Sequence, residues 1–146
     1  MQGFCDPFNR APYHVEDTAI RDWYQKLAQI RRAHPALQTG AAAMLAPALD
    51  VIGVLRTTAD GADVFSDGQK RETILVLVNR TEKQVECTAD LFASDIGLDT
   101  SSRNALLRAG YQRAVSLTDE TSFSFEDGLL SLKLAPCSVQ ILKLEA

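Results

Sequence analysis

The sequence predicts a mainly β protein, a Greek-key antiparallel β-sandwich preceded by one α-helix. Two observations lead to this prediction. A single helical stripe of apolar residues occurs near the start of the chain, and after Gly40 the pattern changes to short strand-like runs separated by turn residues. Short strands without long intervening helices are typical of antiparallel sandwiches.

The chain is expected to begin with an irregular loop over residues 1–16, held by Pro7 and Pro12. A helix follows, capped by Asp17 or Thr18 and stopped after His34 by Pro35. Its apolar residues recur at helical spacing and form one stripe, which needs a large apolar partner. The stripe consists of Ile20, Trp23, Tyr24, Leu27 and Ile30.

The rest of the chain is expected to be strands and turns. Alternation in "SFSF" and "LSLKL" predicts one buried and one wet face, which places Phe123 and Phe125 in the core. Turns are predicted at Asp60-Gly61, at Asp67-Gly68 and at the tight hairpin 126–128. The predicted strands are 51–57, 73–79, 110–117, 122–126, 129–134 and 138–144.

The segment 93–109 is the least regular part of the pattern. Its Ser, Asp and Thr content favours a long loop, with 104–108 as an alternative short strand.

The totals fit one soluble globular domain. A chain of 146 residues is long enough to bury a core. Its net charge of −4 argues against nucleic acid and anionic membranes as partners, because phosphate binding needs clustered Lys and Arg. No apolar stretch approaches the ~20 residues that span a bilayer, and the first residues do not have the pattern of a signal peptide.

Signatures of metal, cofactor and nucleophilic chemistry are absent. Cys5, Cys87 and Cys137 are widely separated, form no CxxC pair and predict neither a zinc site nor a disulfide framework. His14 and His34 each stand alone. We therefore expect no metal and no cofactor. A Ser-His-Asp or Cys-His set remains open, although no GxSxG elbow is present.

The adjacent pairs of acidic residues are predicted to be structural and not catalytic. Glu16-Asp17 stands where acidic residues favour a helix start. Asp119-Glu120 and Glu126-Asp127 fall in predicted turns.

The opening loop holds the candidate binding residues, Asp6 and Arg10. Asp6 precedes Pro7, which biases its backbone to an extended conformation. Arg10 carries a planar guanidinium suited to paired hydrogen bonds with carboxylates or hydroxyls. The two residues either pair with each other and brace the loop, or bind a ligand.

Three segments in this order resemble the α-amylase family, most closely its neopullulanase and cyclomaltodextrinase-like branch. They are "GFCDPFNRAPY", then "WYQKLAQIRRAHPALQTG", then a β domain with "VIGVLR" and "ILVLVNRT". The resemblance spans essentially the whole chain. One departure is that His14 and Val15 follow Pro-Tyr where a Trp is frequent in this branch.

The resemblance implies that residues 1–39 are the last loop and final helix of a (β/α)8 barrel, and that residues 40–146 are the C-terminal β-sandwich, domain C. It implies a retaining glycosidase as the parent, acting on α-glucan or maltooligosaccharide, with its catalytic carboxylates upstream of residue 1. The chain alone would then be inactive. Asp6 and Arg10 would line the substrate cleft and orient sugar hydroxyls.

Two other functions stay open. One is a free-standing carbohydrate-binding or protein-interaction β-sandwich, although the single Trp23 lies in the helical stripe and is expected to pack there. The other is a small enzyme with an unrecognised constellation. With the barrel absent, the face of Ile20, Trp23 and Leu27 is expected either to fold onto the sandwich or to mediate a homodimer. The localisation of this bacterial-type protein stays open: the cysteine pattern slightly favours the cytoplasm, although many bacterial extracellular enzymes also lack disulfides.

Overall fold

The computed structural model describes residues 18–62, 70–93 and 97–146. The predicted Asp67-Gly68 turn lies outside these residues. The chain divides into two compact units, Met1–Ile30 and Arg31–Ala146, and the β-sandwich belongs entirely to the second. No helix among the described residues is long and apolar enough to cross a bilayer.

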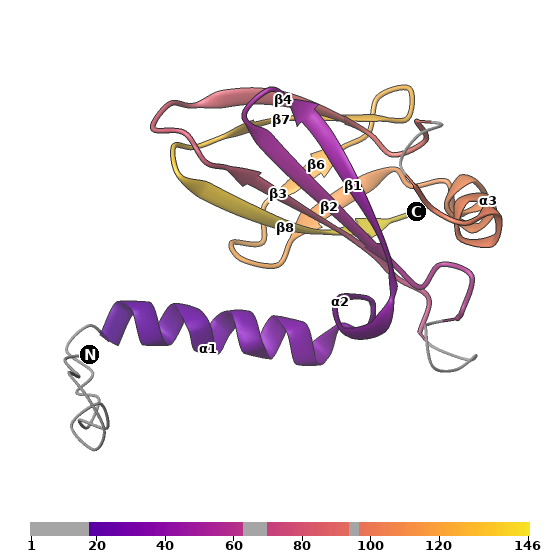
Figure 1. Ribbon diagram of the computed structural model, residues 1–146, viewed down its shortest axis with the longest axis horizontal. Helices are drawn as coiled ribbons and strands as arrows, with labels where there is room; N and C mark the ends of the chain where they lie inside the picture. The colour runs from indigo at the N-terminus through magenta and orange to yellow at the C-terminus, as the bar shows by residue number, and fades with distance from the viewer. Residues whose placement is uncertain (1–17, 63–69, 94–96) are drawn as a thin grey trace, which may run out of the picture. The chain divides into compact units, whose positions relative to one another are not determined.

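Helix α1 spans Thr18–Ala33, which confirms the predicted helix (Figure 1). Ile20, Trp23 and Tyr24 of its stripe are exposed. The helix ends because a residue before proline is disfavoured in the α region, and His34 is extended, with φ −123° and ψ 100°.

A short second helix, α2, spans Pro35–Thr39 and starts at the proline that ended α1. Gly40 follows it at a point of close backbone approach. A Cβ at Gly40 would lie 2.7 Å from the Thr57 carbonyl oxygen and 2.8 Å from the Ala36 carbonyl oxygen. Glycine is therefore required where the chain passes from α2 into the sandwich.

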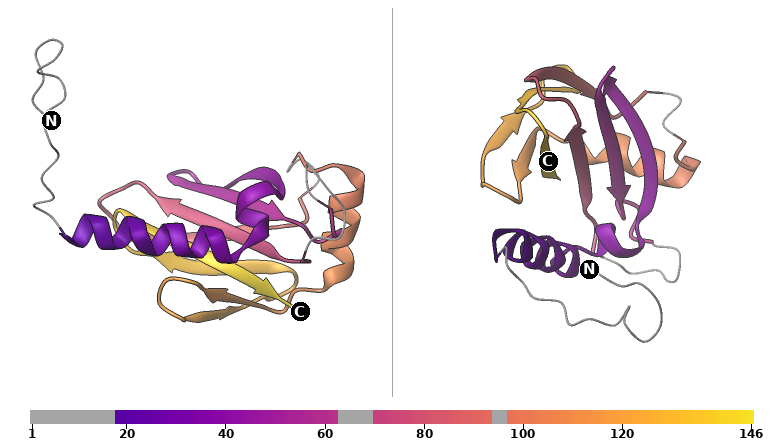
Figure 2. Two further views of the ribbon diagram at one scale, coloured as in Figure 1. Left: turned by 90° about the horizontal axis from the view of Figure 1, so that it is seen from below. Right: turned by 60° about the vertical axis from the view of Figure 1, so that its left-hand side comes forward.

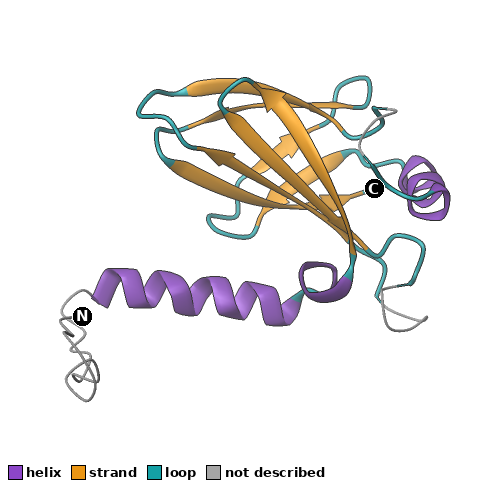
Figure 3. Ribbon diagram, in the orientation of Figure 1, coloured by secondary structure: helices purple, strands orange, loops and turns teal. Residues whose placement is uncertain are grey.

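The sandwich consists of a six-stranded antiparallel sheet, in the order β1-β2-β3-β8-β5-β6, and a two-stranded sheet, β4-β7 (Figure 3). The chain crosses between the sheets after β3, β4, β6 and β7, so the fold is the predicted antiparallel sandwich. The strands are β1 Ala41–Ala48, β2 Val51–Thr57, β3 Thr73–Asn79, β4 Val85–Asp90, β5 Arg113–Ser116, β6 Ser122–Ser124, β7 Leu129–Leu134 and β8 Ser138–Glu145.

The predicted strands are confirmed, and two further strands were missed. β2, β3 and β7 match their predicted bounds, whereas β5 and β6 are shorter than expected. β1 was missed because alanine and proline dominate it, and its register with β2 shifts between Leu45 and Ala48, where Pro47 lies. β4 was missed because Cys87 and Ala89, its buried residues, are small.

The expectation of a loop or short strand over 93–109 was wrong. Residues Thr100–Ala109 form helix α3, which lies at one end of the strands in the left view of Figure 2. Asp99 caps it by accepting a hydrogen bond from the Ser102 backbone nitrogen at 3.0 Å. Gly110 ends it in the left-handed conformation, with φ 61°. The Asp and Ser residues that suggested a loop are a helix cap.

The inner faces of both sheets and α3 share one hydrophobic core. Phe123 and Phe125 pack against it, as predicted. The predicted tight turn at 126–128 is confirmed, because Asp127 and Gly128 have φ of 49° and 80°, the signs of a type I′ turn, and an isolated bridge joins Glu126 to Leu129. The flanking strands β6 and β7 nevertheless belong to different sheets. The largest fully buried core residues are Leu55, Leu75, Leu77, Leu91, Leu106, Leu130, Leu134 and Leu142.

Candidate functional site

The two residues predicted to bind a ligand, Asp6 and Arg10, lie outside the described residues, as do Cys5 and His14. The candidate polar groups among the described residues belong to the sandwich and to its junction with α2.

An open cavity of about 670 Å³ lies between α3 and the neighbouring ends of the strands. Arg71 and Arg108 give it a basic rim, and Tyr111 contributes an aromatic ring. The Tyr111 hydroxyl and the Thr73 hydroxyl lie 2.7 Å apart and share a hydrogen bond. Burial raises the pKa of Tyr111, so the phenol stays protonated and acts as a hydrogen-bonding group.

The carboxylates that line this cavity are engaged in holding the fold. Asp60 accepts hydrogen bonds from the Ala62 backbone nitrogen at 3.1 Å and from the Ser102 hydroxyl at 3.4 Å. Glu72 is 5% exposed, and both of its oxygens are occupied. The cavity can accept polar groups, but its carboxylates are not arranged for acid–base work on a substrate.

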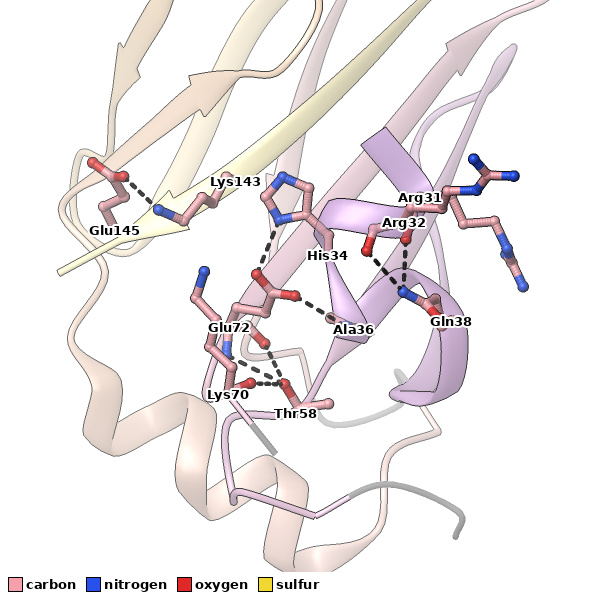
Figure 4. A network of polar contacts seen from close by, with 10 residues as sticks. All are labelled: Arg31, Arg32, His34, Ala36, Gln38, Thr58, Lys70, Glu72, Lys143 and Glu145. Atoms are coloured by element: carbon pink, nitrogen blue, oxygen red, sulfur yellow. Dashed lines mark hydrogen bonds and ion pairs between the residues drawn. The ribbon is translucent and has the colours of Figure 1, made fainter. Parts of the chain in front are cut away.

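Glu72 fastens the junction between α2 and the sandwich (Figure 4). One carboxylate oxygen accepts from the Ala36 backbone nitrogen at 3.0 Å, and the other lies 3.0 Å from Nδ1 of His34. The Glu72 backbone is itself tied to Thr58, whose nitrogen donates to the Glu72 carbonyl at 2.9 Å. The sequence pattern did not reveal this contact, because His34 and Glu72 are 38 residues apart.

The adjacent carboxylate pairs in the described part of the chain are turn residues, as predicted. Asp119 accepts from both the backbone nitrogen and the hydroxyl of Thr121. The Thr121 and Ser116 hydroxyls lower the Asp119 pKa to about 2, which suits a fixed turn carboxylate and not a general acid near neutral pH. Glu120 and Asp127 have positive φ, consistent with turns.

Metal and thiol chemistry finds no support in the described residues. Residues 18–62, 70–93 and 97–146 contain no group of three or more His, Cys, Asp or Glu side chains that could hold a metal ion. Cys87 is buried, which raises the pKa of its thiol and leaves it unreactive. Cys137 is a free thiol on the surface.

Curated proteins similar in sequence are much longer than this chain. The chain is 29% identical over 92 residues to an amylopullulanase of Thermoanaerobacterium saccharolyticum, covering 62% of the chain and 7% of that protein. It is 24% identical over 140 residues to an amylopullulanase of Thermoanaerobacterium thermosulfurigenes, covering 94% of the chain and again 7% of that protein. No family model matches the sequence.

Solved structures share the fold over nearly the whole chain. The α-amylase of Geobacillus thermoleovorans, complexed with acarbose, superposes with a TM-score of 0.69 at 17% identity, over 100% of this chain and 27% of its own. An Anoxybacillus α-amylase superposes with a TM-score of 0.67 at 20% identity, over 99% of this chain and 26% of its own. A cyclomaltodextrinase superposes with a TM-score of 0.65 at 19% identity, over 99% of this chain and 21% of its own.

Proposed function

We propose that this chain, which is the C-terminal part of an α-amylase-family glycosidase, is the structural domain that completes a retaining α-glucan hydrolase. Its similarity to amylopullulanases and its fold, shared with α-amylases over nearly its whole length, support the proposal. The observation that carries it is that this likeness covers about a quarter of each α-amylase chain, 26% and 27%. The remainder would supply the catalytic centre.

The chemistry of the parent would reside upstream. In a retaining glycosidase one carboxylate attacks the anomeric carbon, and a second protonates the leaving oxygen and then activates water. The described carboxylates Glu72, Asp60 and Asp119 are committed to backbone and side-chain donors, which suits a structural role. Asp6 and Arg10 would orient sugar hydroxyls at the edge of the upstream cleft.

Titration calorimetry with maltoheptaose tests this assignment. The chain alone is expected to give no heat beyond dilution, because Asp6 and Arg10 need the barrel to form a subsite. The parent protein is expected to bind, and Asp6→Ala or Arg10→Ala in the parent should weaken binding about tenfold, the effect of losing one hydrogen bond to a charged group. Gln2→Ala in the same loop is the matched control.

A saturable signal from the isolated chain would contradict the proposal and favour the alternative, a free-standing carbohydrate-binding module. Such a module usually presents exposed aromatic rings. Among the described residues the exposed aromatic side chains are Trp23 and Tyr24, both on α1, and the sheets present none. This distribution supports the structural role.

We further propose that the isolated chain forms a homodimer through the apolar face of α1. Ile20 and Trp23 are 56% and 38% exposed, and an apolar stripe of this kind favours self-association in water. Light scattering after size exclusion should show twice the monomer mass at high concentration. Trp23→Asp should give a monomer, whereas Gln25→Asp, off the stripe, should not. A monomer at every concentration would refute the dimer.

A further inference from the structure

The cavity beside α3 has two arginines on its rim that are bound to no acceptor. Arg71, which precedes β3, and Arg108, in the last turn of α3, both line it and are exposed. Neither guanidinium has a hydrogen-bond or ion-pair partner in the described part of the chain. A guanidinium is always charged and carries five N–H donors and no acceptor. The rim therefore presents two free cationic donors from segments far apart in the sequence.

A line of buried hydroxyls ends at the same cavity. It begins at the Ala59 backbone nitrogen, which donates to Oγ1 of Thr57 at 3.0 Å. Oγ1 of Thr57 lies 2.7 Å from Oγ1 of Thr73, which in turn lies 2.7 Å from the Tyr111 hydroxyl. Thr57 and Thr73 are 1% and 0% exposed, whereas Tyr111 lines the cavity.

The burial of the two threonines sets the direction of this line. Thr57 already accepts from Ala59, so its own proton needs an acceptor, and the acceptor that the described residues offer is Thr73. The Thr73 hydroxyl then donates to Tyr111. The Tyr111 proton is left to donate outside the line, and donation along a chain of hydroxyls strengthens it as a donor. Tyr111 is thus a third donor for an occupant of the cavity.

The carboxylates that line the cavity are already engaged. Asp60 accepts from the Ala62 backbone nitrogen and from the Ser102 hydroxyl. Both oxygens of Glu72 are bound at the α2 junction, as Figure 4 shows. An occupant therefore meets three free donors, and it must itself be rich in acceptors to satisfy them.

We propose that this cavity binds a small phosphomonoester, whose phosphoryl group accepts from Arg71, Arg108 and Tyr111. A phosphoryl group fits because its three terminal oxygens and its negative charge match two guanidiniums and one hydroxyl. A neutral ligand would leave both guanidiniums without a counterion. The organic part of the ester has room, because a cavity of about 670 Å³ is in the range that holds small ligands, and Ala59 and Leu144 give it apolar walls. Phosphomonoester binding here goes beyond the proposed function and does not depend on it.

Titration calorimetry of the 146-residue chain in a phosphate-free, low-salt buffer tests the site. Phenyl phosphate is expected to give a saturable signal, and phenol, the matched probe without the phosphoryl group, is expected to give no heat beyond dilution. Inorganic phosphate should bind about tenfold more weakly than phenyl phosphate, because it leaves the apolar walls uncovered. The proposal would be overturned by phenyl phosphate without saturable heat, or by phenol that binds as tightly as its phosphate. Inorganic phosphate as tight as phenyl phosphate would overturn the assignment of an organic part.

Two arginine variants and a matched control locate the site. Arg71→Gln and Arg108→Gln should each weaken the binding of phenyl phosphate about tenfold or more, because each removes hydrogen bonds between charged groups. Arg80→Gln removes the same charge from an arginine that does not line the cavity, and it should leave the affinity unchanged. None of the three should move the urea midpoint, since all three side chains are exposed. Equal affinities of the three variants for phenyl phosphate would overturn the proposal.

Tyr111→Phe tests the hydroxyl line. It removes the outgoing proton and keeps the ring, so it should weaken phenyl phosphate binding about fivefold, the effect of losing one hydrogen bond. It also leaves the Thr73 hydroxyl without its acceptor, so the urea midpoint should fall. Tyr24→Phe, at an exposed position on α1, is the matched control and should change neither quantity. A lower urea midpoint with unchanged affinity would confine Tyr111 to holding the fold and would remove it from the site.

Discussion

Asn79→Asp is expected to destabilise the chain by about 3–5 kcal/mol at neutral pH, since it places an unpaired charge in a buried site. Asn79 is 1% exposed at the end of β3. Its Nδ2 donates to the carbonyls of Lys83 and Ala135, both at 2.8 Å. Its Oδ1 accepts from the Thr81 backbone nitrogen at 3.0 Å and from the Thr81 hydroxyl at 2.9 Å. One side chain thus joins the turn after β3 to the turn between β7 and β8.

The aspartate keeps the accepting side and turns the donating side into an oxygen facing two carbonyls. Carbonyl oxygens and burial both oppose the charge, so the folded-state pKa of this aspartate would lie above its unfolded value of about 3.9. The destabilisation is then smallest below the unfolded pKa of about 3.9. It grows as the pH rises from that value to the folded pKa, and it is complete above the folded pKa.

Urea unfolding at two pH values measures both effects. The midpoint should fall with an unchanged slope. Asn104→Asp, the same change at an exposed position on α3, should cost less than about 0.5 kcal/mol. Asn79→Ala should cost about 2–3 kcal/mol, less than the aspartate, because it leaves polar groups unpaired without adding a charge. An Asn79→Asp protein as stable as Asn104→Asp would refute this account.

The fold could be predicted where the chain carries its own pattern. β2 and β3 are runs of large apolar residues bounded by turns, so their limits were evident from the sequence. β1 is a strand because β2 pairs along it and the core covers Ala43; nothing local in "AAAMLAPA" requires it. α3 does carry a local signal, Asp99 before the helix and Gly110 after it, which the surrounding Ser and Thr residues concealed.

The candidate site was less accessible to the same reasoning. Asp6 and Arg10 were selected through the family resemblance, and their role remains a prediction. The contacts that the structure does place, such as Tyr111 with Thr73, join residues 38 apart, and no spacing rule links such pairs. Asn79 belongs to the "VNRT" segment that carried the resemblance, yet its bonds to Lys83 and Ala135 depend on how β7 and β8 meet β3.

Glu72→Leu is expected to cost about 3 kcal/mol, because it removes both acceptors of the α2 junction while the Ala36 nitrogen stays buried and His34 stays partly buried. The Ala36 nitrogen and His34 Nδ1, each 3.0 Å from a Glu72 oxygen, would lose their partner. Glu72→Gln keeps one carbonyl oxygen for Ala36 and should cost about 1 kcal/mol. Urea unfolding gives both values, and Glu82→Leu, at an exposed position, is the matched control.

A double-mutant cycle identifies the contact responsible. If Glu72 acts by binding His34, the cost of Glu72→Leu should shrink by about 1 kcal/mol or more in a His34→Ala background, because contacting residues are coupled. Additive costs would mean that the Ala36 nitrogen is the partner that matters. Equal costs for Glu72→Leu and Glu82→Leu would mean that the junction does not depend on Glu72 at all. A reduced cost in the His34→Ala background would mean that the contact of His34 with Glu72 holds α2 to the sandwich. This would explain physically why a histidine lies between α1 and α2.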